Sequence, residues 1–554
     1  MNIIPAIFVL IFLPLNVSAV MISEFCPDTY LSGDPDEYIV LQGAGNLDNT
    51  MITDGEGSFR FPAGTDGKGT LVIARNGTAY ATVHHQPPDF EMRNYSMLVP
   101  DVVASGNFQM GNAGDELMVY EGNRMTQKIA WPGDVRPREG QVHYFSNGTW
   151  DKRVLMIGQT RLAPQSFEGV KGTSFITPDC SEEVYAQFIG SAGSEILVNV
   201  YEFTSPTMAD ALIRARHRGV NVTVLIEGGP VGGISTAENE ICSRLVKEGI
   251  PVLLMGTTGT SHAPYRYDHA KYIVVDGEAL LITSENFTDN GFPGTSDTGN
   301  RGWGICLYDP GVAAYFRNVF LSDSRGDGIF STNGKPGIIS EAAHEDRTRE
   351  FTPASYPDLT VTPVIAPDTS YLIDDLLNSA RDRIDIEQAY ITNESPGVLN
   401  PFLRDAVNAS RRGVHVRVLL DSYWFNTDGP NDNDELVASI NQIAKTEGLP
   451  IEARCADLQA NQIQKIHNKG VIVDGRRVLI SSINWNTNSP TFNREAGVIV
   501  DSLESGAYYG RAFSGDWDST VQVNSGDLHE LDIKLIITGI VICALLVLCW
   551  KRKQ

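Results

Sequence analysis

The sequence has little positive charge. Its 43 lysine and arginine residues are outnumbered by 68 aspartate and glutamate residues, which gives a formal net charge of -25 at pH 7. Such a chain repels polyanions at long range and offers no basic footprint for nucleic acid. The acidity is typical of a soluble surface or of adaptation to a salty medium, and it says little about a buried site.

Cysteine is scarce as well. The chain has seven cysteines and no C-x-x-C pair, which excludes the common zinc-binding patterns. His, Asp and Glu residues show no cluster with ligand spacing either, so we expect neither a metal nor another cofactor. Two cysteines lie near the C-terminus, and the odd number that remains leaves at least one unpaired within the chain. These five are Cys26, Cys180, Cys242, Cys306 and Cys455.

Long apolar runs occur near the two ends of the sequence. The run from Ile3 to Leu15 precedes Val17-Ser18-Ala19, a small-residue cleavage pattern. Residues 1–19 are therefore typical of a secretory signal peptide, although a buried first strand is an alternative.

The second run extends from Leu535 to Trp550 and is followed by Lys551-Arg552-Lys553. Its length is near the lower limit for a spanning helix, and a buried core helix is the alternative. Because basic residues stay on the cytoplasmic side, the pattern predicts one transmembrane helix within 533–550. We expect a single-pass protein of the cell membrane with its globular part outside the cell.

The chain of 554 residues is long enough for two to four domains, and it contains an internal repeat. Several segments return in the same order with nearly constant spacing. They indicate two homologous halves, 166–325 and 360–522, joined by a linker at 326–359. Among the repeated pairs are Ile176-Thr177-Pro178-Asp179 with Ile365-Ala366-Pro367-Asp368, Arg218-Gly219-Val220 with Arg412-Gly413-Val414, and Glu248-Gly249-Ile250-Pro251 with Glu447-Gly448-Leu449-Pro450.

Each half has the pattern of an α/β fold. The apolar run from Ile196 to Val200 predicts a short strand, and the β-branched run from Val220 to Ile226 predicts a buried one. Between them, the stretch from Met208 to His217 has helical spacing and ends just before Gly219.

Residues 20–160 differ, because short β-branched runs alternate there with Gly, Asn and Asp turns. This pattern predicts an all-β sandwich. Several short pieces resemble the lamin-tail domain, an immunoglobulin-like fold, and the resemblance implies a binding or spacing module without chemistry of its own. The pieces are Ile22-Ser23-Glu24-Phe25, Asp36-Glu37-Tyr38-Ile39-Val40-Leu41, Asp54-Gly55-Glu56-Gly57, Phe61-Pro62-Ala63-Gly64-Thr65 and Leu71-Val72-Ile73-Ala74-Arg75.

The repeat carries two copies of one polar motif, and every member falls at the same distance from its histidine in both. Alternation along a strand places each His and the Lys two residues later on one face. A single H-x-K would mean little, but two aligned copies point to shared chemistry. The copies are His269, Lys271, Asp276, Ser284 and Asn286 in the first half, and His467, Lys469, Asp474, Ser482 and Asn484 in the second.

The paired motif resembles that of the phospholipase D superfamily. The resemblance implies two α/β halves around a pseudo-twofold axis, with both motifs in one cleft, no metal and a covalent phosphohistidine. It also implies that His269 is the nucleophile and His467 the general acid. The lysines would neutralise the phosphoryl oxygens, and the Asn and Ser side chains would donate hydrogen bonds to them.

Some motif positions admit a structural explanation. Asp276 and Asp474 precede glycines in hairpin turns, and we expect them to cap those turns. Phe287 and Trp485 follow the two asparagines, and core packing is a better explanation for them than a substrate wall.

The superfamily also has an acidic residue behind each histidine. Glu495 supplies it in the second half, where we expect it behind His467. In the first half Gly302 stands at that place. Asp297 is as far along the chain from His269 as Glu495 is from His467, which makes it a candidate substitute.

Three functions fit the sequence. The first is a phospholipase or a phosphatidyl transferase similar to cardiolipin synthase, favoured by the predicted anchor and the acidity. The second is a membrane-tethered nuclease of the same superfamily. In a nuclease, clustered arginines on predicted helices would bind the phosphates. Arginines that simply face solvent on those helices are an equally good explanation. The third is an inactive surface-binding protein, which the intact His–Lys pairs disfavour. The arginines are Arg214, Arg216, Arg218, Arg404, Arg411 and Arg412.

Overall fold

The computed structural model describes residues 20–519, apart from residues 44, 132–136, 147, 295–296, 340–344, 396 and 430–431. The predicted signal peptide and transmembrane helix lie outside the described residues. In the part that is described, no helix is both long and apolar enough to cross a membrane. The chain divides into two compact units, Met1–Gln159 and Thr160–Gln554.

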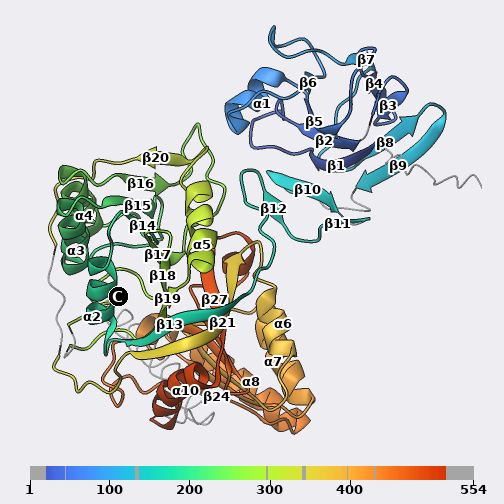
Figure 1. Cartoon of the computed structure of the whole chain (residues 1–554). Coiled ribbons are helices and arrows are strands. Elements are labelled where there is room, and N and C mark those ends of the chain that lie inside the picture. Colours follow the sequence, from blue (N-terminus) through green and yellow to red (C-terminus); the bar gives the residue numbers. More distant parts are fainter. Residues whose placement is uncertain are drawn as a thin grey trace, which may run out of the picture. The chain divides into compact units, whose positions relative to one another are not determined.

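The first unit is built almost entirely from β-strands (Figure 1). Its strands form a sheet in the order β11-β10-β1-β2-β5-β6, with β12 paired to β10, and a second sheet in the order β7-β4-β3-β8-β9. The elements are β1 (Met21–Cys26), β2 (Tyr38–Gly43), β3 (Thr50–Thr53), β4 (Gly57–Arg60), β5 (Gly69–Ala74), α1 (Gly77–His84), β6 (Phe90–Glu91), β7 (Val103–Gly106), β8 (Asp115–Glu121), β9 (Arg124–Trp131), β10 (Gln141–Ser146), β11 (Thr149–Trp150) and β12 (Leu155–Met156).

One apolar cluster in this unit takes side chains from both sheets. Phe25 and Ile39 of the first sheet share it with Ile52, Phe59 and Leu117 of the second, and all five are fully or almost fully buried. Two sheets that share one core form a sandwich, so the all-β prediction for this part of the chain agrees with the structure. Its likeness to the lamin-tail domain stays a prediction.

The second unit begins with the first half of the repeat. Its elements are β13 (Phe167–Thr177), α2 (Ser181–Gly190), β14 (Glu195–Val200), α3 (Pro206–His217), β15 (Asn221–Glu227), α4 (Thr236–Lys247), β16 (Val252–Met255), β17 (Lys271–Val275), β18 (Ala279–Thr283), β19 (Gly302–Tyr308), α5 (Pro310–Asp323) and β20 (Ile329–Ser331). Helix α3 begins where sequence rules expect, because Ser205 caps it and Pro206 fixes its first turn.

The second half repeats this order. Its elements are β21 (Ala354–Ala366), α6 (Leu372–Asn378), β22 (Arg383–Gln388), α7 (Pro401–Arg411), β23 (His415–Leu420), the short 3₁₀ turn Trp424–Asn426, α8 (Asn433–Glu447), β24 (Ile451–Cys455), β25 (Lys469–Val473), β26 (Arg477–Ser481), α9 (Asn488–Thr491), β27 (Glu495–Asp501) and α10 (Leu503–Asp518). The sheet extends into the predicted linker 326–359, because β20 pairs with the edge strand β16 and β21 begins at Ala354.

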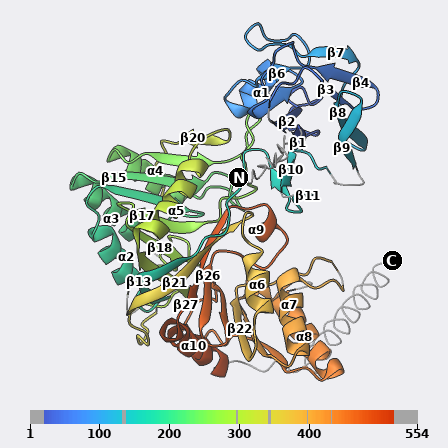
Figure 2. The same ribbon diagram turned by 45° about the vertical axis from the view of Figure 1, so that its right-hand side comes forward.

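The two halves share one sheet. Its order is β20-β16-β15-β14-β17-β18-β19-β13-β21-β27-β26-β25-β22-β23-β24. Apart from β20, this order reads the same from both ends, with the antiparallel pair β13 and β21 in the middle. The arrangement has the pseudo-twofold symmetry that the repeat predicts, and Figure 2 shows the two wings of the sheet.

Helices cover the sheet in layers. Helices α2, α3 and α4 pack on one face of the first half, and α6, α7 and α8 pack on the second. A third cluster, which contains α5 and α10, takes side chains from both halves. The halves are thus one folded body, and a site at their junction is held rigidly.

Two buried arginines also join the halves. Arg301 of the first half pairs with Asp516 of the second at 2.7 Å, and Arg494 of the second pairs with Asp323 of the first at 2.7 Å. The repeated Asp179 and Asp368 each contact the arginine of their own half at 3.1 Å. Because an unpaired buried charge is costly, these clusters fix how the halves meet.

Candidate active site

Each motif histidine is held by the other half of the repeat. The backbone N–H of His269 donates to the carbonyl of Arg494 at 2.8 Å, and that of His467 donates to the carbonyl of Arg301 at 2.9 Å. Both histidines stand just before a central strand, β17 or β25. The arginines that join the halves therefore also position the two histidines beside their junction.

The motif lysines are fully buried. Lys271 Nζ donates to the carbonyl of His269 at 2.6 Å, and Lys469 Nζ donates to the carbonyl of His467 at 2.5 Å. Burial lowers the pKa of Lys271 to about 8, although the negative charge of Glu495 acts to raise it. Burial also holds the pKa of Lys469 well below its usual value. A phosphoryl anion between them would favour their charged forms.

A carboxylate contacts each histidine, and it comes from the other half. Glu495 Oε2 lies 2.8 Å from His269 Nδ1 in a hydrogen bond. The prediction that Glu495 stands behind His467 is therefore wrong. Glu495 is fixed further by hydrogen bonds from Ser482 Oγ at 2.6 Å and Asn493 Nδ2 at 3.0 Å.

Glu285 is the carboxylate behind His467, and sequence reasoning missed it. Its Oε2 lies 3.2 Å from His467 Nδ1 and accepts a hydrogen bond from Asn300 Nδ2 at 3.0 Å. The contact with His467 is an ion-pair distance without hydrogen-bond geometry. Asp297, the predicted substitute beside His269, does not take that place, because Glu495 occupies it and Asp297 lies in the segment before β19, where its backbone bridges Asp346.

The two halves place this carboxylate on different elements. In the second half Glu495 begins β27, and in the first half Gly302 begins β19. A Cβ atom at Gly302 would lie 2.4 Å from Glu285 Oε1 and 2.6 Å from Ser284 Oγ. Glycine at position 302 thus leaves space for the side chain of Glu285. The residue of the second half that corresponds to Glu285 is Ile483.

The motif serines do not face a substrate. Ser284 and Ser482 are fully buried, and their hydroxyls accept hydrogen bonds from the backbone of Trp303 at 3.2 Å and of Ala496 at 3.0 Å. They hold neighbouring strands together, and Ser482 orients Glu495 as well. The predicted donation of their hydrogen bonds to phosphoryl oxygens has no support in this arrangement.

The motif asparagines keep unused hydrogen-bonding atoms. The amide oxygens of Asn286 and Asn484 are buried without a partner among the described residues. Asn286 gives its Nδ2 to Glu202 at 3.4 Å. Phe287 and Trp485, the residues that follow, are fully buried in the two helix-covered cores, so the core-packing interpretation agrees with the structure.

Asp276 and Asp474 lie in the turns, away from the histidines. Asp276 accepts hydrogen bonds from the backbone N–H groups of residues 193–195, and Asp474 accepts them from residues 381–383. Partial burial alone would raise the pKa of each carboxyl, but these hydrogen bonds outweigh it and lower the pKa. Their role is to fix the turn, as the sequence indicates.

Burial keeps both imidazoles neutral. It lowers the pKa of His269 to about 4, although Glu495 works in the opposite direction. Burial and the charges of Lys469 and Lys465 hold the pKa of His467 well below its usual value. Burial also raises the pKa of Glu285 to about 7, so this carboxyl can carry a proton near neutral pH.

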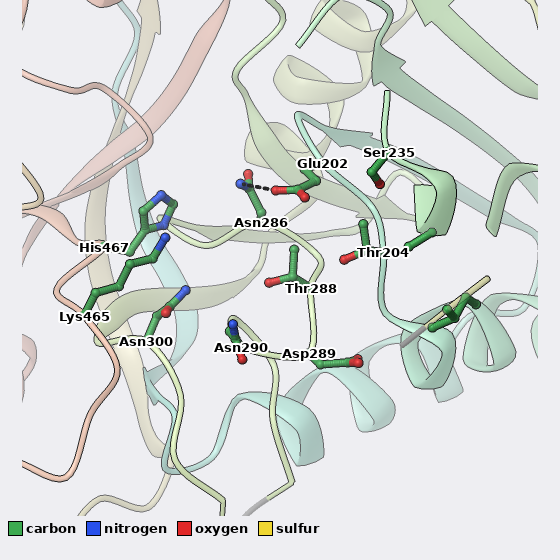
Figure 3. Close-up of a pocket in the computed structure, with 12 residues that line it drawn as sticks. Glu202, Thr204, Ser235, Asn286, Thr288, Asp289, Asn290, Asn300, Lys465 and His467 are labelled. Atoms are coloured by element: carbon green, nitrogen blue, oxygen red, sulfur yellow. Dashed lines mark hydrogen bonds between the residues drawn. The ribbon is translucent and has the colours of Figure 1, made fainter. Parts of the chain in front are cut away.

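A polar cavity of about 340 Å³ opens beside His467. Lys465 and Glu202 line it, and neither was singled out from the sequence (Figure 3). Lys465 is a third lysine near the two motifs, since its charge acts on His467, Glu285 and Lys469. Its position two residues before a motif histidine is a signal that sequence analysis could have used.

Three of the six clustered arginines considered for phosphate binding have local partners. Arg218 donates to the carbonyl of Ile189 at 3.1 Å, and Arg412 donates to the carbonyl of Asn378 at 3.0 Å. Arg411 pairs with Glu447 at 2.7 Å. These contacts tie helix ends together.

The five described cysteines are all buried and free, and the described residues contain no cluster of three or more His, Cys, Asp or Glu that could hold a metal.

Two α/β halves around a pseudo-twofold axis, each with a His–Lys motif at their junction, define a phospholipase-D-like protein. A family model described as "Cardiolipin synthase, PLD-like domain" matches residues 185–324 and 373–517. The matched residues make up half of the chain, one stretch in each half of the repeat, and the chain belongs to this family.

Several solved structures are similar. A phosphatidylserine synthase of Haemophilus influenzae is 14% identical with a TM-score of 0.49, and the match covers 67% of this chain and 93% of that one. Nuc of Salmonella typhimurium, a phospholipase D family member, is 23% identical with a TM-score of 0.25, over 31% and 100% of the two chains. NucT of Helicobacter pylori is 18% identical with a TM-score of 0.25, over 30% and 99%. No curated protein sequence matches the chain.

The exchange of carboxylate positions predicts the effect of substitutions at Gly302. Gly302→Ala should lower kcat on bis-p-nitrophenyl phosphate by about 10- to 100-fold, because the added methyl group displaces Glu285 by about 1 Å. Glu285→Ile should be at least as damaging. The double variant Glu285→Ile/Gly302→Glu rebuilds the arrangement of the second half, and we expect it to regain much of the lost activity.

Gly510→Ala is the matched control, since nothing lies within 4 Å of a Cβ atom there. Thermal unfolding of each variant separates misfolding from loss of the carboxylate. Equal activity of Glu285→Ile and wild type would show that Glu285 does not support catalysis.

Proposed function

We propose that this protein is a phosphodiesterase that acts on phospholipids through a phosphohistidine intermediate, by hydrolysis or phosphatidyl transfer. One observation carries the proposal: two neutral imidazoles, each backed by a carboxylate from the other half, share a site with Lys271, Lys469 and Lys465. Neutral imidazole is the form that attacks phosphorus, and the lysines offset the charge of the phosphoryl oxygens.

In the first step, His269 Nε2 bonds to phosphorus and the bond from phosphorus to the leaving alcohol breaks. Glu495 accepts the hydrogen bond of His269 Nδ1, which leaves the lone pair of Nε2 free and stabilises the cation that forms. His467 Nε2 gives its proton to the departing oxygen while its Nδ1 takes up the proton of Glu285, 3.2 Å away, so the imidazole stays neutral and Glu285 becomes a carboxylate. Glu285, with a pKa of about 7, keeps a proton available beside it.

In the second step, His467 removes a proton from water or from a second alcohol. The oxygen of that molecule bonds to phosphorus, and the bond to His269 Nε2 breaks. Water gives hydrolysis and an alcohol gives transfer, so the same residues support both outcomes.

Phospholipid is the substrate class that we favour. The family description names a cardiolipin synthase, and the net charge of -25 disfavours the approach of a nucleic acid. Nuclease activity is the second candidate, and an inactive surface protein is the third. The complete His–Lys–carboxylate sets disfavour the inactive protein, whereas a nuclease of the same superfamily would use the same sets.

The protonation states predict a bell-shaped pH profile. For a phospholipid, kcat/KM should fall below about pH 4, where His269 gains a proton, and above about pH 7, where Glu285 loses its proton. With bis-p-nitrophenyl phosphate the leaving group needs no proton, so the alkaline limb should move to about pH 8, where Lys271 loses its charge. Identical alkaline limbs for both substrates would contradict the role of His467 and Glu285.

The apolar runs at the two ends of the sequence support a location at the outer face of the cell membrane. We expect protease added to intact cells to remove the two catalytic halves and to leave the C-terminal basic cluster protected. Protection of the halves, with the basic cluster cut, would reverse the orientation.

The proposed function is tested with the purified chain on three substrates: phospholipid vesicles, plasmid DNA and bis-p-nitrophenyl phosphate, at physiological salt. Turnover of phospholipid faster than DNA, lost in His269→Ala, supports it. Faster cleavage of DNA would favour the nuclease, and no turnover of any substrate would favour the inactive surface protein.

A further inference from the structure

The aromatic ring of Tyr201 packs against the proposed nucleophile. Tyr201 follows β14, and its ring centroid lies 4.6 Å from that of His269, with an angle of 64° between the two ring planes. Such a T-shaped pair is a preferred arrangement of aromatic rings, and it favours one orientation of each ring relative to the other. The imidazole is therefore held on two sides, by Tyr201 and by the hydrogen bond between its Nδ1 and Glu495.

The same ring also lies beside the lysine of the first motif. Lys271 Nζ is 5.4 Å from the centroid of the Tyr201 ring, over its face. An aromatic face attracts a cation at this distance, and the attraction is stronger when both groups are shielded from water. Burial lowers the pKa of Lys271 to about 8, and the ring acts to keep this ammonium group charged. One side chain thus supports both the His and the Lys of the first motif.

Tyr201 is itself held in place. Its hydroxyl oxygen accepts a hydrogen bond from the backbone N–H of Val231 at 2.8 Å. Its ring also meets that of Tyr267 in a T-shaped arrangement, with the two centroids 6.4 Å apart. Strand β14 sets where the side chain starts, because Val200, the residue before it, pairs with Lys271 in the sheet. The ring is therefore oriented before substrate binds.

The second half has no ring at this position. Strands β14 and β22 take equivalent places beside the motif strands β17 and β25, so Ala389, which follows β22, corresponds to Tyr201. The methyl group of an alanine offers neither a ring face nor a hydroxyl. The surroundings of the two histidines thus differ in an aromatic ring as well as in the origin of their carboxylates.

This difference matches the unequal charges of the two histidines in the proposed mechanism. The imidazole of His269 becomes cationic when its Nε2 bonds to phosphorus, whereas that of His467 passes a proton on and stays neutral. An aromatic ring attracts a cation more strongly than a neutral group. The ring of Tyr201 therefore favours the phosphohistidine over the free imidazole of His269.

We infer that Tyr201 is a positioning residue that makes His269 the nucleophile, because its ring orients the imidazole and stabilises the cationic phosphohistidine. The inference rests on the proposed function and deepens it, since it gives a reason why the first histidine forms the covalent bond. It concerns the ring alone, so phenylalanine should serve almost as well as tyrosine.

The test measures the two chemical steps separately with bis-p-nitrophenyl phosphate. In His467→Ala the phosphoenzyme accumulates, so the burst gives the rate of its formation. Samples quenched in base after removal of excess substrate give the rate of its loss. Tyr201→Leu is added to this variant, because leucine is apolar and has no ring. We expect formation to slow by about 10-fold or more and the lifetime of the phosphoenzyme to shorten, since the cation loses its aromatic partner.

Two further variants in the same background serve as controls. Tyr201→Phe restores the ring without the hydroxyl, and it should keep both rates within about twofold of the values with tyrosine. Tyr308→Leu replaces an exposed tyrosine at the end of β19, whose other end, Gly302, lies at the site. It should change neither rate. Thermal unfolding shows whether each variant is folded, and Tyr201→Met replaces Tyr201→Leu if the latter does not fold.

The opposite directions of the two effects separate the inference from a structural role. Slower formation together with slower loss would mean that Tyr201 only shapes the site, and unchanged rates in folded Tyr201→Leu would mean that it has no role. Either result overturns the inference. Equal damage in Tyr201→Phe and Tyr201→Leu would overturn it too, because the hydroxyl would then carry the effect. If His467→Ala with Tyr201 intact gives neither a burst nor a phosphohistidine, the proposed function itself fails.

Discussion

Replacement of His269 by alanine should abolish turnover of bis-p-nitrophenyl phosphate, with a loss on the order of 10⁴-fold or more. The side chain provides the atom that bonds to phosphorus, and neither water nor another described side chain has its position. His269 Nδ1 is held at 2.8 Å by Glu495, so its reactive nitrogen is oriented before substrate arrives. A stopped-flow trace should show neither a burst nor a steady state of p-nitrophenolate.

The matched control for this variant is His415→Ala, which removes an exposed histidine at the start of β23. It should retain the activity of the wild type. Circular dichroism and thermal unfolding show whether each variant is folded, since His269→Ala also removes a hydrogen bond from the buried carboxylate of Glu495. Substantial activity of a folded His269→Ala variant would exclude this residue as the nucleophile.

Replacement of His467 by alanine should give a different result. The p-nitrophenolate ion leaves without a proton, so His269 can still be phosphorylated and one equivalent of product should appear in a burst. Attack by water then lacks its general base, and the steady state should be slower by roughly 10²- to 10⁴-fold. Stopped-flow absorbance gives the burst amplitude, and the steady-state slope gives the second rate.

A phospholipid supplies the internal comparison for this variant. Its alkoxide is a poor leaving group and needs the proton of His467, so the burst should be absent with the lipid. A burst seen only in His269→Ala, and never in His467→Ala, would show that the two histidines have the opposite roles.

Much of this site can be predicted from the sequence, because the repeat aligns the two motifs without knowledge of the fold. Lys271 and Lys469 begin equivalent strands, and His269 and His467 stand two residues before them, so the spacing is fixed locally. The hairpin role of Asp276 is likewise local, since an Asp-Gly turn depends on neighbouring residues alone. Such features are readable because they do not depend on how the halves pack.

The partner of each histidine depends on that packing. Glu495 is closer in sequence to His467 than to His269, yet it contacts His269, because the backbone at Arg494 pairs with the motif of the other half. Distance along the chain therefore assigns Glu495 to the wrong histidine. The same reasoning wrongly makes Asp297 the partner of His269.

Glu285 could have been found from the repeat alignment. The positions of Glu285 and Gly302 in the first half correspond to Ile483 and Glu495 in the second. The carboxylate thus stands at different positions in the two halves, and glycine stands in the first half where Glu495 stands in the second. Only the structure gives the reason, since a side chain at 302 and the carboxylate of Glu285 would occupy the same space.

The central claim is that His269 forms a covalent bond to phosphorus, and mapping the phosphoryl group tests it most directly. The His467→Ala variant is mixed with bis-p-nitrophenyl phosphate, quenched in base to preserve phosphohistidine, digested, and its peptides are sequenced by mass spectrometry; the wild type is treated in parallel. We expect one p-nitrophenylphosphoryl group, the part of the diester that remains after one p-nitrophenolate has left, on His269 in both proteins. A phosphoryl group on His467 of the wild type, or turnover by the wild type with no phosphorylated peptide from either histidine, would contradict it.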